Sequence, residues 1–101
     1  MPRPVSKPAV PTTPQVADAG ELGRAVRAQR LTAGLRIDDA AALCGVSVTV
    51  LSRLENTASG VSTTSLFKVL DGLGLSLLIF DKLEISQVLA TLSRPARKRV
   101  P

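Results

Sequence analysis

Two short helical patterns joined by a tight turn leave this chain few folds to adopt. The first pattern covers residues 37–44 and the second covers residues 47–55, with Gly45 between them. Glycine adopts positive φ without steric cost, so it suits a tight turn between two helices. Ala41 and Cys44 are small enough to let the helices cross closely, and Ser47 can cap the second one. The pattern predicts a helix-turn-helix.

Further helical patterns flank this pair, which predicts an all-α domain of four to five helices. Residues 21–31 place apolar side chains three and four apart, and Gly34 ends that helix. Ser62 or Thr63 can cap another helix that reaches Leu73, and residues 85–92 show a weaker helical pattern. Residues 75–80 are short, apolar and partly alternating, which favours a strand.

The two ends of the chain differ in composition from the domain between them. Residues 1–20 contain five prolines, so we expect a flexible arm there. The helix-turn-helix domain covers residues 21–80, with residues 81–93 as a possible extra helix and residues 94–101 as a basic tail. The net charge of +5 lies mostly in that tail, because residues 21–93 carry seven basic and seven acidic side chains. Bulk charge is therefore a weak argument for DNA binding by the domain itself.

The residue types present exclude several classes of site. The chain has no histidine and one cysteine, so it lacks a zinc-binding cluster and the commonest general base. We therefore expect no enzyme, no metal and no cofactor, and an inert buried thiol at Cys44. No apolar run approaches the ~20 residues of a membrane span, and no secretory signal is present. We expect a cytoplasmic, DNA-associated protein with no membrane contact.

The chain resembles the lambda-repressor-like (Xre/Cro) helix-turn-helix family in residues 22–35, LGRAVRAQRLTAGL, and residues 40–55, AAALCGVSVTVLSRLE. It resembles one branch, the HipB-type antitoxins, in TTSLFKVLDGLGLSLLIF and in the Glu55-Asn56 pair. The resemblance covers residues 21–80. It implies a fourth helix that runs into a strand pairing across a dimer. It also implies an ion pair between Arg30 and Glu55, and a HipA-like kinase toxin as a partner.

Candidate DNA contacts follow from the geometry of this motif. The N-terminal half of the second helix enters the major groove, where its side chains can contact base edges. The predicted base contacts are Ser47, Val48, Thr49, Ser52 and Arg53, and the alternative for Val48 is an incidental surface valine. The predicted phosphate contacts, from helix N-termini and basic side chains, are Arg36, Thr63, Thr64 and Lys68. The alternative for Thr63 is a helix cap, and for Lys68 it is ordinary solvated surface.

Two positions depart from the family pattern. Arg36 stands where a capping threonine is usual, which weakens the helix cap by about 1 kcal/mol. Ile37 stands where a glutamine often contacts phosphate, so one expected DNA contact is missing unless Arg36 replaces it.

The predicted strand is an apolar edge that needs a partner. Two copies paired across a two-fold axis would satisfy both edges and bury their apolar faces. We therefore expect a homodimer on an inverted-repeat operator in double-stranded DNA, with recognition helices about 34 Å apart. The residues that form this contact are Leu75, Leu77, Leu78, Ile79 and Phe80.

These features predict a sequence-specific transcriptional repressor that is the antitoxin and autorepressor of a HipBA-like toxin–antitoxin pair. One alternative is a free-standing Xre-type regulator without a toxin. Another is a protein-interaction module that binds DNA weakly. Residues 81–92, together with the basic tail, either dock on the toxin or form a helix that packs back on the core.

Overall fold

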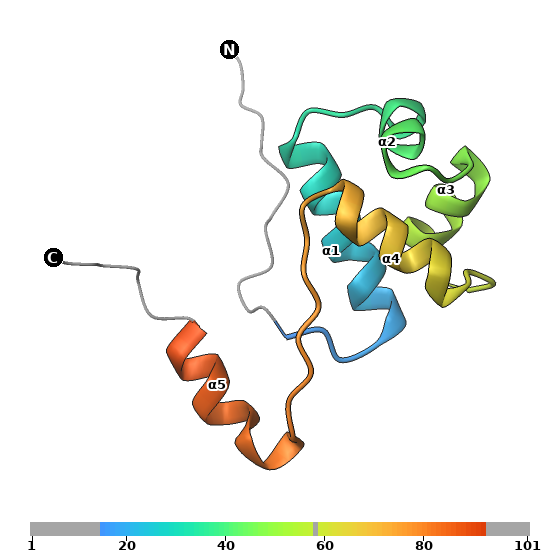
Figure 1. Ribbon diagram of the computed structural model, residues 1–101. Helices are drawn as coiled ribbons and strands as arrows, with labels where there is room; N and C mark the ends of the chain where they lie inside the picture. The colour runs from blue at the N-terminus through green and yellow to red at the C-terminus, as the bar shows by residue number, and fades with distance from the viewer. Residues whose placement is uncertain (1–14, 58, 93–101) are drawn as a thin grey trace, which may run out of the picture.

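The computed structural model describes residues 15–57 and 59–92, and their regular structure is entirely helical (Figure 1). The elements are α1 (Ala19–Thr32), α2 (Ile37–Cys44), α3 (Val48–Asn56), α4 (Thr63–Gly72), the short 3-10 helix η1 (Lys82–Glu84) and α5 (Ile85–Leu92). In Figure 1, α1 to α4 form one body, and an extended segment leads from α4 to α5, which stands apart from that body. The predicted all-α fold is confirmed.

Local signals in the sequence set the ends of these helices. The Asp18 carboxylate accepts a hydrogen bond from the Glu21 N–H at 2.8 Å, so α1 begins two residues before its predicted start. Gly34 and Gly45 follow α1 and α2 with φ of 74° and 76°, a conformation that favours glycine. Arg36 makes no side-chain cap at the start of α2, as the missing hydroxyl predicts.

Four helices share one small core. Its largest fully buried side chains are Val26 on α1, Leu51 and Leu54 on α3, and Val69 on α4. α1 packs on α3, and α2 packs on both α3 and α4. Because the buried face of α3 is held by its neighbours, the other face of this helix is turned to solvent.

Two glycines allow helices of the core to approach closely, and the sequence patterns did not reveal either. A Cβ on Gly23 of α1 would collide with the carbonyl oxygen of Leu54. A Cβ on Gly72 of α4 would lie 2.6 Å from the Sγ of Cys44 on α2. Burial, and secondarily the charge of Asp71, raises the pKa of the Cys44 thiol, which favours the unreactive thiol form.

Residues 75–80 follow an extended path away from the core (Figure 1). Leu75 is half-buried, and its N–H donates to the Leu70 carbonyl at 2.8 Å, whereas the side chains of residues 77–80 are exposed. The described part of the chain contains no strand. Strand hydrogen bonds require a second strand, and residues 15–57 and 59–92 place none beside this segment. Pairing across a dimer therefore stays a prediction.

The last described helix is present where its pattern predicted it. No residue of α5 is buried, so the alternative in which this helix packs back on the core is wrong. Most of the predicted arm, residues 1–14, and the predicted basic tail, residues 94–101, lie outside the described residues. Among the helices of the described chain, none is long and apolar enough to cross a membrane.

Candidate nucleic-acid interface

The predicted base-contacting residues lie together at the start of α3 and one turn further along it. Ser47, Val48, Thr49 and Arg53 are exposed, and Ser52 is half-buried. Positions three and four apart lie on the same side of a helix, so these side chains form one surface opposite the buried Leu51 and Leu54. We call this set, residues 47, 48, 49, 52 and 53, the recognition face.

Two hydroxyls of the recognition face already accept hydrogen bonds within the protein. The Ser47 Oγ caps α3 by accepting from the Val50 N–H at 3.0 Å. The Asn56 Nδ2 donates to the carbonyl oxygen and the Oγ of Ser52, at 2.9 Å and 3.3 Å. Each serine hydroxyl keeps its proton for donation to an external acceptor. These bonds also fix the positions of both side chains.

Arg53 lies against the loop that connects α3 to α4. A Cβ on Gly60 would sit 3.5 Å from both the Cδ and the Nη1 of Arg53, so the arginine side chain passes directly over this glycine. Gly60 has a φ of 70°, which a side chain would strain. Arg53 makes no ion pair with any described residue, so its guanidinium is available to an external anion. The sequence predicted a loop between α3 and α4, but it did not predict the contact of this loop with Arg53.

α4 carries three of the four predicted phosphate contacts, with Thr63 and Thr64 in its first turn and Lys68 one turn further along. Ser62, rather than Thr63, caps the helix by accepting from the Ser65 N–H at 3.0 Å. The alternative role of Thr63 as the cap is therefore wrong. Thr63, Thr64 and Lys68 are all exposed.

The electrostatics of α3 and α4 differ from those of α1 and α2. The first turns of α3 and α4 contain no acidic residue, whereas α1 and α2 have acidic residues there. Between residues 45 and 70 the charged side chains are Arg53, Glu55 and Lys68, and Glu55 is buried. The exposed charges of this region are therefore both positive, next to two helix N-termini that carry partial positive charge.

Arg36 lies apart from the other predicted phosphate contacts, at the start of α2. Its Nη2 is 3.3 Å from the Asp38 carboxylate, and both side chains are largely exposed. An exposed pair of this kind contributes little stability, so DNA phosphate can compete for the arginine.

The ion pair implied by the family resemblance is present in the structure. The Arg30 Nε and Nη2 donate to the two carboxylate oxygens of Glu55 at 2.7 Å and 2.9 Å. The Arg30 Nη1 also donates to the Leu35 carbonyl at 3.0 Å. The side chains of the pair are only 10% and 2% exposed. The hydrogen bonds to Glu55 raise the pKa of Arg30, and the pair ties α1 to the end of α3.

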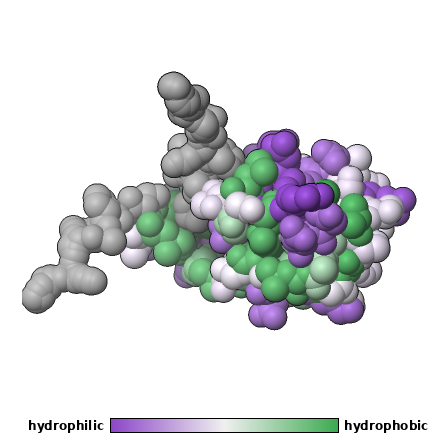
Figure 2. Space-filling view, turned by 90° about the horizontal axis from the view of Figure 1, so that it is seen from above, coloured by the Kyte–Doolittle hydropathy of each residue, from purple (hydrophilic) through white to green (hydrophobic). Residues whose placement is uncertain are grey.

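The surface around these helices is chemically mixed. Seen from above, the four-helix body places hydrophilic and hydrophobic residues side by side (Figure 2). Among its exposed large apolar residues are Leu43 on α2, Val48 on α3 and Phe67 on α4. The surface near the recognition face is thus not simply basic, and recognition there would depend on individual side chains.

Comparisons with known proteins agree with this geometry. The family model described as a helix-turn-helix domain matches residues 21–78. The chain is similar to a solved structure described as "Structure of HipA-HipB-O2-O3 complex", with 25% identity and a TM-score of 0.63 over 67% of this chain and 96% of that chain. The values are the same for structures described as "HipB-O4 20mer complex" and "MDT Protein". Comparison with the curated proteins gives no match. The chain therefore belongs to the helix-turn-helix domain family, and its resemblance to the HipB-like members of that family is confirmed.

Proposed function

We propose that this protein is a sequence-specific transcriptional repressor that binds double-stranded operator DNA as a homodimer. One observation carries the proposal: the exposed recognition face adjoins two acid-free helix N-termini, and the exposed charges between residues 45 and 70 are both positive. Sequence-specific DNA binding needs both the exposed side chains and the positive charge beside them. Side chains that reach base edges give specificity, and cations with helix N-termini position the protein on phosphates.

The residues of the recognition face suit different parts of a base pair. Arg53 has the planar fork that binds the O6 and N7 of guanine, and nothing in the described chain competes for it. Thr49 and the two serines can donate to base acceptors, and Val48 can contact a thymine methyl. Thr63, Thr64, Lys68 and Arg36 would contact the flanking phosphates. The similarity of the chain to structures described as "HipB-O4 20mer complex" and "Structure of HipA-HipB-O2-O3 complex" supports a HipB-like role for the domain as a whole.

The first experiment compares a recognition-face variant with a charge-matched control. We expect Thr49→Ala combined with Arg53→Ala to weaken binding to the DNA upstream of the protein's own gene by about 30-fold or more, since each of the two base contacts supplies about 1–3 kcal/mol of discrimination. Arg24→Ala removes an exposed positive charge from α1 and should change the affinity by less than about threefold. Fluorescence anisotropy against operator and scrambled DNA measures both effects.

The salt dependence of the same titrations separates base reading from phosphate binding. Lys68→Ala should weaken operator and scrambled DNA alike and reduce the slope of log K against log salt by about one per subunit. If the parent binds operator and scrambled DNA equally, with no loss in the double variant, the repressor function is wrong. The protein-interaction alternative, which the exposed Leu43 and Phe67 favour, would then replace it.

We further propose that the protein is the antitoxin and autorepressor of a toxin–antitoxin pair. Support comes from the similarity to a structure whose description names HipA together with HipB and O2-O3. A kinase-like product of the neighbouring gene should copurify with this protein at a fixed stoichiometry after co-expression. Recovery of this protein alone, while the neighbouring product is folded and soluble, would favour a free-standing regulator.

A further inference from the structure

The segment after α4 carries an unusual share of exposed apolar side chains. Six of the ten large hydrophobic residues exposed in the described chain lie within residues 77–92, and Ile79 and Leu83 are 88% and 91% exposed. Hydrophobic residues are also visible on the part of the molecule that projects beside the four-helix body (Figure 2). A concentration of this kind marks a surface that a partner covers.

If residues 75–80 of two chains paired as strands, this pairing by itself would not bury all the exposed apolar side chains of the segment. Two strands are at best marginally stable in water unless a helix or a further strand packs on them. Side chains alternate between the two faces of a strand, so Leu75, Leu77 and Ile79 would share one face, and Leu78 and Phe80 the other. Leu75 packs against the core, so its face would lie toward the four-helix body. The face formed by Leu78 and Phe80, which we call the outer face, would remain without a cover.

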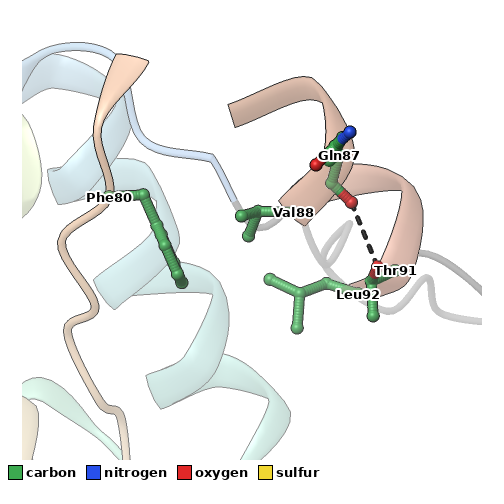
Figure 3. Close-up of a pocket in the computed structure, with 5 residues that line it drawn as sticks. All are labelled: Phe80, Gln87, Val88, Thr91 and Leu92. Atoms are coloured by element: carbon green, nitrogen blue, oxygen red, sulfur yellow. Dashed lines mark hydrogen bonds between the residues drawn. The ribbon is translucent and has the colours of Figure 1, made fainter. Parts of the chain in front are cut away.

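α5 lies opposite Phe80, one of the two residues of this outer face. The Phe80 side chain points toward Val88 and Leu92 across an open hollow of about 350 Å³ (Figure 3). Gln87 and Thr91 complete its lining, and the Thr91 hydroxyl donates to the Gln87 carbonyl at 3.1 Å. Phe80 and Leu92 nevertheless stay 39% and 48% exposed. In a single chain, α5 thus faces Phe80 without burying it.

We propose that α5 docks on a second copy of this chain, so that the two α5 helices together cover the outer face of the two-stranded sheet. This inference rests on the strand-paired dimer that is part of the proposed function. Each α5 would contact the strand of the partner subunit as well as its own. The hollow would close, and the apolar face of α5 would become buried.

The composition and position of α5 favour a second copy over an unrelated protein. Ile85, Val88 and Leu89 lie with Leu92 on one face of the helix, and α5 contains no charged residue. The two helices themselves can therefore meet without like-charge repulsion between them. α5 begins only five residues after Phe80, so the chain keeps it beside its strand. Two-fold symmetry then brings the second α5 to the same sheet.

The test compares two single variants of the full chain, each of which adds one negative charge to a different face of α5. Val88→Asp puts a carboxylate on the apolar face, whereas Ala90→Asp puts it on the opposite, exposed face. We expect Val88→Asp to raise the Kd of the dimer by about 30-fold or more, because a buried unpaired charge is costly. Ala90→Asp should change it by less than about threefold. Sedimentation equilibrium measures the Kd, and helical circular dichroism verifies that the four-helix body stays folded.

Each other result rejects the inference for a different reason. If the parent and both variants dimerise equally, α5 does not dock on a second copy, although the proposed repressor dimer stands. If the parent is monomeric even at about 100 μM, the dimer itself is wrong and both proposals fall. If Val88→Asp leaves the dimer intact but abolishes copurification with the neighbouring gene product, the helix binds that partner instead. Equal weakening by both variants would mean that the apolar face has no special role.

Discussion

Glu55→Ala is expected to lower the free energy of unfolding by about 3–5 kcal/mol, because it leaves the buried Arg30 guanidinium without its carboxylate. Arg30 is 8% exposed and makes two of its hydrogen bonds to Glu55. An arginine guanidinium is not deprotonated at any pH at which proteins fold, so Arg30 cannot escape the cost by losing a proton in this variant. A domain of this size has a total stability of about 5–15 kcal/mol. Urea denaturation should therefore show a large shift, or no folded state at all.

Two further variants separate a buried pair from ion pairing in general. Arg36→Ala removes only the exposed pair with Asp38 and should cost less than about 1 kcal/mol. Arg30→Met combined with Glu55→Leu removes both buried charges and should recover most of the stability lost in Glu55→Ala. A double variant as unstable as Glu55→Ala would show that the loss comes from packing rather than from an uncompensated charge.

Gly23→Ala is expected to destabilise the protein by about 3 kcal/mol, although alanine usually favours a helix over glycine by about 1 kcal/mol. The added Cβ would collide with the Leu54 carbonyl oxygen and would lie 3.1 Å from the carbonyl oxygen of Glu55. Both are backbone atoms of α3, so no side-chain rotation can relieve the contact. α1 would have to move away from α3, which would also stretch the ion pair between Arg30 and Glu55.

Gly20→Ala is the matched control for this clash, since it makes the same substitution three residues earlier in α1. There the nearest neighbour of the new Cβ is the Asp18 Oδ1 at 3.3 Å. This oxygen caps α1, but it belongs to a side chain and needs to shift by only a few tenths of an ångström, which the cap can tolerate. We expect the stability of this variant to stay within about 1 kcal/mol of the parent. If thermal unfolding shows equal destabilisation at both glycines, close packing of α1 on α3 is not the cause.

The positions of the helices follow from the sequence because their signals are local. The cap at Ser47, the positive φ at Gly45 and the apolar spacing each act within a few residues. The same signals placed the recognition face on one exposed side of α3. The start of α1 was predicted two residues late because the capping role of Asp18 was not recognised.

Contacts between distant residues depend on how the helices pack, and spacing along the chain does not determine them. Arg30 and Glu55 are 25 residues apart, and their pairing was expected only from family resemblance. The contacts of Gly23 with Leu54, and of Gly60 with Arg53, were found only in the tertiary structure, because each depends on how closely one segment approaches another. The same holds for α5. Its pattern predicted a helix, but only the packing of the chain shows that the helix buries none of its residues.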